Sequence, residues 1–534
     1  MSEIGGTTGS AGPGASPAAG QGARLTAWLA VAAIVVSILI MIVVSAGGPN
    51  LSVPAVHGAA HPPWWHPLHF TATFTVLSMW FAMLLGCAGV LAGLVATARG
   101  ARLPVRLLLA LGFLAVLVII VLPAAGSTDA LSYAANGRMA VIGHSPYVMT
   151  PKQLKYIGDP IGRQIGIGIP DLWNSTVSVY GPVATAAEWV AAKLGGVSLA
   201  HIVFWLKAIE AVSYLVVALV LDRLLRRDPA MRLRAHLLWT ANPLLLWEIV
   251  ASGHIDGLAA AFGLLAVVAL RRNLASSGAF ISGLMVGLAT GVKVEFALLG
   301  LAVAWASRRS VRALAAAAAG FGVITLPAYL LAGTPAIKVL VTRSPGVTWD
   351  TMYQLFWRPV LGYTQFDVNH QPPHLELVAY LLFAAIALLA MVRVPHRPPS
   401  PGIAELPALA PALGLSLAWL FVTAFQRPWY DVMAISLLAL YSASLLDWVV
   451  LIRLLAGATV YVIAIGNPVE PRWLYDIGQF DAMWLTPTVR LLATIALVGL
   501  CVSGRWGWRS SYPQAGVVDN APDNVPGQQL PLAT

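Results

Sequence analysis

The chain has 534 residues, of which 58% are hydrophobic and only 10% are charged. Soluble domains carry about 25% charged residues, so the composition excludes a soluble multidomain protein and indicates many membrane helices of about 20 residues each. The net charge of +10 is accounted for by basic cytoplasmic loops and gives no reason to expect binding to nucleic acid. Cys87 and Cys501 both lie in apolar runs and offer no disulfide framework.

A series of apolar runs lies between two polar ends. Residues 1–23 and 511–534 are expected to be disordered cytoplasmic tails, and residues 24–510 are expected to form one transmembrane domain. Long polar segments occur at 47–71, 124–198 and 333–374. The apolar runs are 24–46, 72–98, 104–123, 199–225, 235–252, 257–270, 279–307, 311–332, 375–394, 404–425, 430–446, 448–465 and 486–503.

The run at 279–307 conflicts with a single crossing. Lys293 and Glu295 interrupt its middle, and charges at that depth are costly unless they line a polar cavity. A single crossing would also put the basic residues at 308–312 outside, against the positive-inside rule. We therefore expect two half-helices that enter the membrane and return, meeting near Lys293.

With this hairpin the sequence predicts an all-α polytopic membrane protein. It would have about 14 membrane segments, two of them short and hairpin-like. Both termini would be cytoplasmic. All the long polar loops would then be extracytoplasmic and would carry short interfacial helices.

Asp129 follows the third apolar run and opens a stretch, 130–139, that can form a short helix lying on the membrane. Two interpretations are open for this residue. As an N-terminal carboxylate it can cap the helix. As a carboxylate beside an interfacial cavity it can act as a general base that removes a proton from a hydroxyl.

Two further groups of polar residues interrupt apolar sequence. The turn at 252–257 contains His254 and Asp256 and is expected on the same membrane face as Asp129. A Gly- and Asp-rich turn needs no function, but polar residues at membrane depth are candidates for a site. Lys293 is suited to hold an anion such as a phosphate. Snorkelling to an interface is less natural for a lysine in the middle of an apolar run, whereas pairing with Glu295 is an alternative that alone can account for both residues.

The segment 426–431 combines an arginine with aromatic residues. Trp429 and Tyr430 are typical of anchors in the headgroup zone. Arg427, expected outside, is suited to grip a lipid-linked phosphate next to a sugar face. Arg343 is a weaker candidate for the same task.

The remaining motifs identify no further functional site. His57, His61, His66 and His69 lie in a Pro- and Trp-rich loop without zinc-site spacing or an accompanying carboxylate, so a metal site is disfavoured and the role of the loop stays open. The chain contains neither a Walker loop nor a dinucleotide fingerprint.

An ordered set of short motifs resembles the bacterial polyprenyl-phosphate-mannose-dependent α-(1,6)-mannosyltransferases of the GT-C superfamily, of the type that builds the lipomannan core. Each motif is weakly specific, and their order is what carries the resemblance. They are Asp129-Ala-Leu-Ser-Tyr133, Gly143-His144-Ser-Pro-Tyr147, Tyr180-Gly-Pro182, Asn242-Pro-Leu-Leu245, Gly253-His-Ile-Asp-Gly257, Val292-Lys293 and Pro428-Trp-Tyr430.

The resemblance implies a GT-C-type bundle in the bacterial plasma membrane with an extracytoplasmic active site. The expected reaction transfers a hexose, with mannose preferred, from polyprenyl phosphate to a hydroxyl of an envelope glycan or glycolipid, with inversion. Asp129 would be the base. No cofactor or essential metal is expected. The implied donor and acceptor contacts are Lys293, His254, Asp256, Arg427, Arg343, Tyr133, Tyr180, Trp429, Tyr430 and His144.

Other functions fit the same sequence. A transferase of arabinofuranose, or of another sugar carried on polyprenyl phosphate, has the same requirements. A transporter or flippase of lipid-linked saccharides also uses broken helices with buried charges. The sequence leaves the sugar, the acceptor, the linkage and the oligomeric state open.

Overall fold

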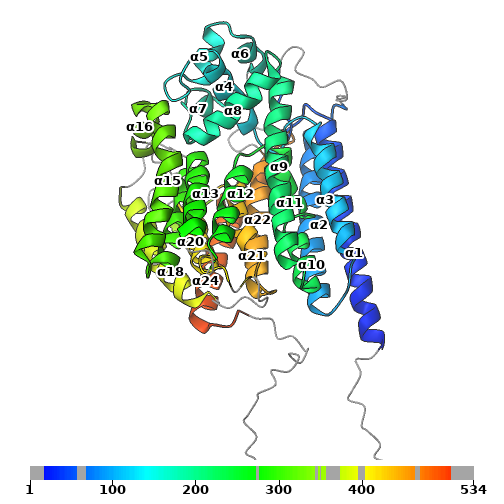
Figure 1. Cartoon of the computed structure of the whole chain (residues 1–534). Helices are drawn as coiled ribbons and strands as arrows, with labels where there is room; N and C mark the ends of the chain where they lie inside the picture. The colour runs from blue at the N-terminus through cyan, green and yellow to red at the C-terminus, as the bar shows by residue number, and fades with distance from the viewer. Residues whose placement is uncertain are drawn as a thin grey trace, which may run out of the picture.

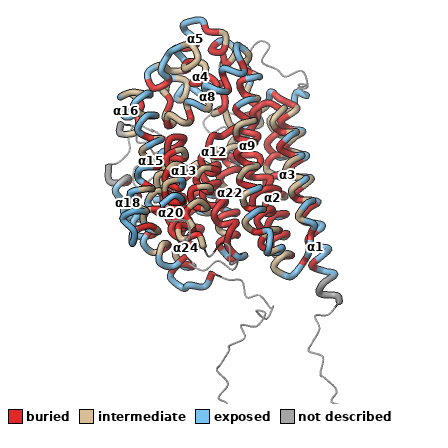
Figure 2. Tube along the Cα trace, viewed as in Figure 1, coloured by how far each residue is buried: buried red, intermediate tan, exposed pale blue. Residues whose placement is uncertain are grey.

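The computed structural model describes residues 17–56, 68–166, 168–271, 276–342, 347–348, 350–356, 373–394, 403, 405–463 and 469–506. These residues form a bundle of helices without β-strands (Figure 1). Buried residues run along the middle of the bundle, whereas the outer faces of helices such as α15 (Val311–Ala332) are exposed (Figure 2). Those exposed faces are apolar, as at Leu326 and Leu330, which is the arrangement expected where helices meet lipid.

The candidate membrane spans confirm that the chain crosses the membrane several times, but they do not confirm the expected number of segments. Within the described residues, six helices are long and apolar enough to cross a membrane, or seven if one bent pair counts as a span. Several shorter apolar helices accompany them. The chain is therefore a multi-pass membrane protein, and the expected count of about 14 segments stays a prediction.

The first third of the chain forms three long helices and a cap. The long helices are α1 (Pro17–Ala46), α2 (Ala72–Ala98) and α3 (Val105–Ile120). The cap stands at one end of the bundle, and α1 begins and α24 (Thr486–Ser503) ends at the other (Figure 1). The cap helices are α4 (Asp129–Val141), α5 (Pro151–Tyr156), α6 (Pro160–Ile165), α7 (Asp171–Asn174) and α8 (Pro182–Gly195).

The middle of the chain contains the broken helices. After α9 (Leu199–Leu225) and α10 (Pro229–Leu238), the short α11 (Pro243–Leu245) and the π-helix η1 (Leu246–Ala251) meet α12 (Asp256–Ala269) at a bend of 112°. Then come α13 (Ser276–Val292), the 3-10 turn η2 (Val294–Phe296), α14 (Ala297–Ser307), α15 and α16 (Thr334–Thr342).

The chain reverses direction near Lys293, as the hairpin prediction requires. A side chain on Gly300 of α14 would meet Val286 of α13 at 3.2 Å, so the two helices fold back on each other. Beyond the second reversal, α15 runs beside α13 in the same direction, since Gly283 lies against Ala317 and Gly287 against Phe321.

The C-terminal third closes the bundle. The run expected at 430–446 is a 3-10 turn and a short helix followed by irregular backbone rather than one long helix. The elements are α18 (Pro373–Arg393), α20 (Leu409–Val422), η3 (Pro428–Asp431), α21 (Val432–Leu438), α22 (Leu445–Val462), α23 (Arg472–Phe480), η4 (Asp481–Leu485) and α24.

A buried acid lies between two cap helices. Glu188 of α8 is fully buried, and its side chain faces that of Asn136 on α4. Burial raises the pKa of the Glu188 carboxyl to about 8, and the nearby Asn136 side chain opposes this shift. The folded protein therefore holds this proton at pH values where the unfolded chain has released it, and stability falls as the pH rises.

We predict that Glu188→Gln removes this pH dependence. Between the ordinary pKa of a glutamate and pH 8, the wild type should lose about 1.4 kcal/mol of stability per pH unit relative to the variant. Thermal unfolding of both proteins in detergent from pH 5.5 to 8.5 measures the difference. A constant gap between the two curves would contradict the buried, protonated Glu188.

Candidate functional site

The candidate site is built from breaks between helices. Asp129 is the first residue of α4, His254 lies in the bend before α12, and Lys293 separates α13 from η2. Trp429 belongs to η3. Irregular backbone at such depth is tolerated where it is buried in protein or borders a polar space, and here four such breaks meet.

Asp129 is held by the contact between two of these breaks. The Ala125 N–H donates to the carbonyl of Ala251 at 3.1 Å, and the Ser252 hydroxyl donates to the carbonyl of Ala125 at 2.7 Å. Gly126 turns the chain with a φ of +89°, which a residue with a side chain rarely adopts, and its Cα faces Trp247. The loop before Asp129 is therefore fixed against the bend that carries His254.

Two tyrosines stand beside the Asp129 carboxylate. Tyr133, one helical turn further along α4, has its hydroxyl 3.5 Å from Asp129 Oδ2 and 3.0 Å from the Tyr180 hydroxyl. The two rings meet edge to face with centroids 5.1 Å apart. The structure thus brings Tyr133 and Tyr180 to the base candidate.

The turn that carries Tyr180 docks closely on the hairpin. Gly181 donates its N–H to the carbonyl of Val292 at 3.1 Å, and a Cβ on Gly181 would lie 2.2 Å from the carbonyl oxygen of Gly291. Only a residue without a side chain allows this approach. The contact places Tyr180 and Lys293 on either side of one backbone junction.

His254 has no solvent exposure and is fixed in orientation. Its Nδ1 lies 2.5 Å from the carbonyl oxygen of Glu248, and its Nε2 lies 3.7 Å from Asp129 Oδ2. The Trp429 ring stacks on the imidazole with centroids 3.6 Å apart and planes at 19°. One face of Trp429 is therefore covered by His254, and the indole is buried rather than exposed as a headgroup anchor would be.

Lys293 is paired with Asp256. Its Nζ donates to Asp256 Oδ1 at 2.7 Å and lies 3.4 Å from the centroid of the Tyr430 ring. The expected pairing of Lys293 with Glu295 is wrong, because the ion pair is formed by Asp256. Both members of the pair are buried, so each charge depends on the other.

Arg427 completes the positive side of the site. Its guanidinium lies over the rings of Phe425 and Tyr461, 4.4 Å and 5.4 Å from their centroids. Within the described part of the chain, it forms an ion pair with no carboxylate. Arg427 is therefore the cation of the site that remains available to an anionic ligand.

These neighbours set the proton affinity of Asp129. Burial raises the pKa of its carboxyl above the ordinary value, while the charges of Arg427 and Lys293 and the hydrogen bonds from Ser127 and Tyr133 lower it. The side chain keeps 23% of its surface exposed, so a substrate proton can reach it. A partly exposed carboxylate beside two cations fits a general base.

One expected site residue, His144, does not join this cluster, and another, Arg343, lies outside the described residues. His144 is exposed and follows the far end of α4, about 18 Å along the helix axis from Asp129. His69 is exposed as well. The residues outside the description are Arg343, His57, His61 and His66.

Sequence reasoning missed the residues that support the site from apolar runs. Tyr461 lies within α22, where nothing in the local pattern distinguishes it, and Glu210 of α9 accepts from the Leu258 N–H at 3.0 Å at the start of α12. Glu248 supplies a carbonyl rather than its side chain, which no side-chain pattern can reveal.

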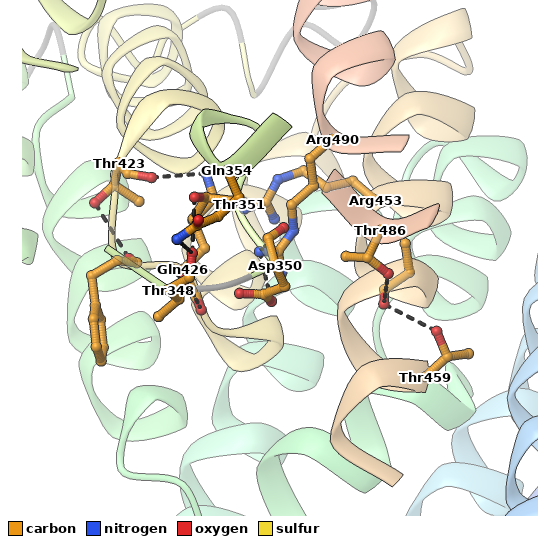
Figure 3. A network of polar contacts seen from close by, with 12 residues as sticks. Thr348, Asp350, Thr351, Gln354, Thr423, Gln426, Arg453, Thr459, Thr486 and Arg490 are labelled. Carbon is orange, nitrogen blue, oxygen red and sulfur yellow. Dashed lines mark hydrogen bonds and ion pairs between the residues drawn. The ribbon is translucent and has the colours of Figure 1, made fainter. Parts of the chain in front are cut away.

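Figure 3 shows a polar network that contains Arg453, Arg490 and Asp350. Arg453 pairs with Asp431 and donates to the carbonyl of Leu420 at 2.7 Å. Arg490 pairs with Asp350 at 2.7 Å. These buried ion pairs fix the backbone that presents Arg427, Trp429 and Tyr430.

Fold and site together define a multi-pass membrane protein with a buried, charged site at its helix breaks. Residues 21–309 match the family model described as Alpha-(1->6)-mannopyranosyltransferase, N-terminal domain. This match covers more than half of the chain, and the protein belongs to that family. Asp129, His254, Asp256 and Lys293 lie inside the matched region, whereas Arg427 and Trp429 lie beyond it.

Two curated proteins are similar over a shorter stretch. One, named as a probable alpha-(1->6)-mannopyranosyltransferase of Mycolicibacterium smegmatis, is 26% identical over 140 residues, which is 26% of this chain and 24% of that protein. The other, an alpha-(1->6)-mannopyranosyltransferase of Mycobacterium tuberculosis, is 28% identical over 142 residues, covering 27% and 23%. The similarity thus spans about a quarter of each relative.

We predict that Lys293→Met destabilises the protein by about 3–5 kcal/mol, because Asp256 is left as an uncompensated buried charge. The double variant Lys293→Met/Asp256→Asn should recover most of that loss. Thermal unfolding in detergent compares the three proteins, with Asp256→Asn as the matched single control. A double variant no more stable than Lys293→Met would contradict the assignment of the pair.

Proposed function

We propose that this protein is a membrane α-(1,6)-mannosyltransferase that takes mannose from polyprenyl phosphate and transfers it to a hydroxyl of a cell-envelope glycan or glycolipid. The observation that carries the proposal is the convergence of Asp129, the Lys293–Asp256 pair and Arg427 on one site. Family membership supports the reaction class. A lipid-linked donor explains why the site lies within a helix bundle.

In the proposed reaction the acceptor hydroxyl gives its proton to Asp129 Oδ2 while its oxygen attacks the anomeric carbon of the donor. The bond between that carbon and the phosphate oxygen breaks, and polyprenyl phosphate leaves with the bonding electrons. Attack on the face opposite the leaving group converts a β-linked donor into an α-linked product.

Arg427 is proposed as the residue that meets the leaving phosphate. The guanidinium is held by aromatic faces instead of a carboxylate, and its planar donors match phosphate oxygens. Lys293, already paired with Asp256, adds positive charge next to it. With two cations in place we propose that no divalent metal is essential.

The remaining contacts are proposed for orientation. Tyr133 and Tyr180 offer hydroxyls next to Asp129, and Asp256 and Tyr430 hold Lys293 in place. The active site is proposed to open on the extracytoplasmic side of the bacterial plasma membrane, with both termini in the cytoplasm. The location of the cap and of the two described chain ends at opposite ends of the bundle (Figure 1) supports this arrangement.

We predict that Asp129→Asn abolishes transfer, with a loss of at least about 100-fold in kcat, because an amide cannot take up the proton. The variant should keep its thermal stability. The rate is measured with purified protein, polyprenyl-phosphate-mannose and an α-(1,6)-mannan acceptor. The matched control is Asp171→Asn, which replaces an exposed acid of the same cap. Turnover of Asp129→Asn within a few-fold of wild type would reject the base.

Arg427→Gln should have two effects. Donor affinity falls because the phosphate loses its partner. The acid limb of the pH–rate profile also moves to higher pH, because the arginine charge lowers the pKa of Asp129 and a base must be deprotonated to act. Arg427→Lys keeps the positive charge, so the acid limb of its pH–rate profile should stay at the wild-type pH. An unshifted limb in Arg427→Gln, or a KM for the donor equal to that of wild type, would argue against the assigned role.

A further inference from the structure

The imidazole of His254 has one nitrogen that the rest of the structure leaves without a partner. Its Nε2 is buried and, within the described residues, forms no hydrogen bond. Burying a polar atom without a partner is unfavourable. A fixed histidine with an unpaired nitrogen 3.7 Å from a candidate general base therefore has to be explained.

The tautomer follows from the other nitrogen. A carbonyl oxygen can only accept, so Nδ1, 2.5 Å from the Glu248 carbonyl, carries a proton. In the neutral ring Nε2 is then a lone-pair acceptor. Stacking on Trp429 at 3.6 Å fixes the plane of the ring, so Nε2 is held 3.7 Å from Asp129 Oδ2.

A group close to Nε2 that can deliver a proton is Asp129. Its Oδ2 lies 3.7 Å away, beyond hydrogen-bond distance. While Asp129 is a carboxylate, two acceptors face each other and no hydrogen bond forms. Once Oδ2 has taken up a proton, its O–H becomes a donor, and a small side-chain movement brings it to Nε2.

We propose that His254 Nε2 receives a hydrogen bond from Asp129 after Asp129 has deprotonated the acceptor hydroxyl, so that the proton is held between Oδ2 and Nε2 until the product leaves. This inference rests on the proposed function and assigns His254 as the positioning residue of the base. The proton goes from the hydroxyl to Oδ2 and returns to water through the exposed part of Asp129 when the product has gone.

Several charged or titratable groups face this pair, and each must stay unchanged in the test. They lie on α4, the turn before α8, α12, the hairpin, the segment before η3, and α22. These groups are Tyr133, Tyr180, Asp256, Lys293, Arg427 and Tyr461.

The test compares His254→Asn with His254→Gln. The Asn amide can keep the bond to the Glu248 carbonyl but offers nothing at the Nε2 position, whereas the longer Gln side chain can place its amide oxygen there. Because the hydrogen bond to Nε2 stabilises protonated Asp129, its loss lowers the pKa of Asp129. The acid limb of kcat/KM for the acceptor should move down by about one pH unit in His254→Asn. In His254→Gln it should return toward wild type.

The direction of the shift decides between models. An acid limb that stays in place means that Nε2 does not bond to Asp129. A limb that moves to higher pH means that His254 is an imidazolium that stabilises the carboxylate. Either result overturns the inference. Both leave the proposed function intact as long as Asp129→Asn is inactive, whereas a wild-type protein without transfer would refute the proposed function itself.

A second measurement does not depend on turnover. Infrared difference spectra between wild type and Asp129→Asn, taken across a pH titration, report the protonated carboxyl of Asp129. Removing its hydrogen-bond acceptor in His254→Asn should raise the C=O stretching frequency and lower the titration midpoint. A band and midpoint equal to those of wild type would overturn the proposal even if the variant is inactive.

Discussion

The buried ion pair of Lys293 and Asp256 is the interaction on which the site depends. Lys293 sits where the hairpin reverses, Asp256 begins α12, and Tyr430 beneath the ammonium belongs to η3. One salt bridge thus ties three helix breaks together. Without it an unpaired charge would be left in an apolar bundle, and the elements that surround Asp129 would no longer be joined to one another by this contact.

The breaks themselves are stabilised by backbone contacts. The loop before Asp129 bonds to the bend before His254, and Gly181 bonds to the last turn of α13. Each contact gives a hydrogen-bond partner to backbone N–H or C=O groups that a broken helix leaves unpaired. The cost of irregular backbone inside the bundle is therefore offset by the same contacts that align Asp129, Tyr180 and Lys293.

Much of this arrangement could be predicted from sequence, because membrane helices and buried charges leave strong signals. The helices at 72–98, 199–225, 311–332 and 486–503 begin and end where the apolar runs do, and a lysine within an apolar run predicted the reversal near Lys293. Asp129 and His254 were found because polar residues next to apolar runs are conspicuous, whereas Tyr133 and Tyr180 were found through the motifs that carry the resemblance.

Other features could not be predicted, for physical reasons. The pairing of Lys293 with Asp256 rather than with nearby Glu295 is a tertiary contact between distant segments, which spacing along the chain does not encode. Tyr461 resembles any aromatic residue of an apolar helix, and Glu248 contributes through its carbonyl. His144 was included because it lies in one of the short motifs that carry the resemblance. Such a motif predicts a turn but does not show which way its side chains point.

The most direct test of the account follows the anomeric carbon of the sugar. Purified protein in detergent is given polyprenyl phosphate carrying 1-¹³C-mannose in β linkage and an α-(1,6)-mannan acceptor, and the reaction is followed by NMR. The account predicts that the β-phosphate signal is replaced by an α-(1,6)-glycosidic signal as free polyprenyl phosphate is released. Unchanged donor, or a product with retained β configuration, would contradict it.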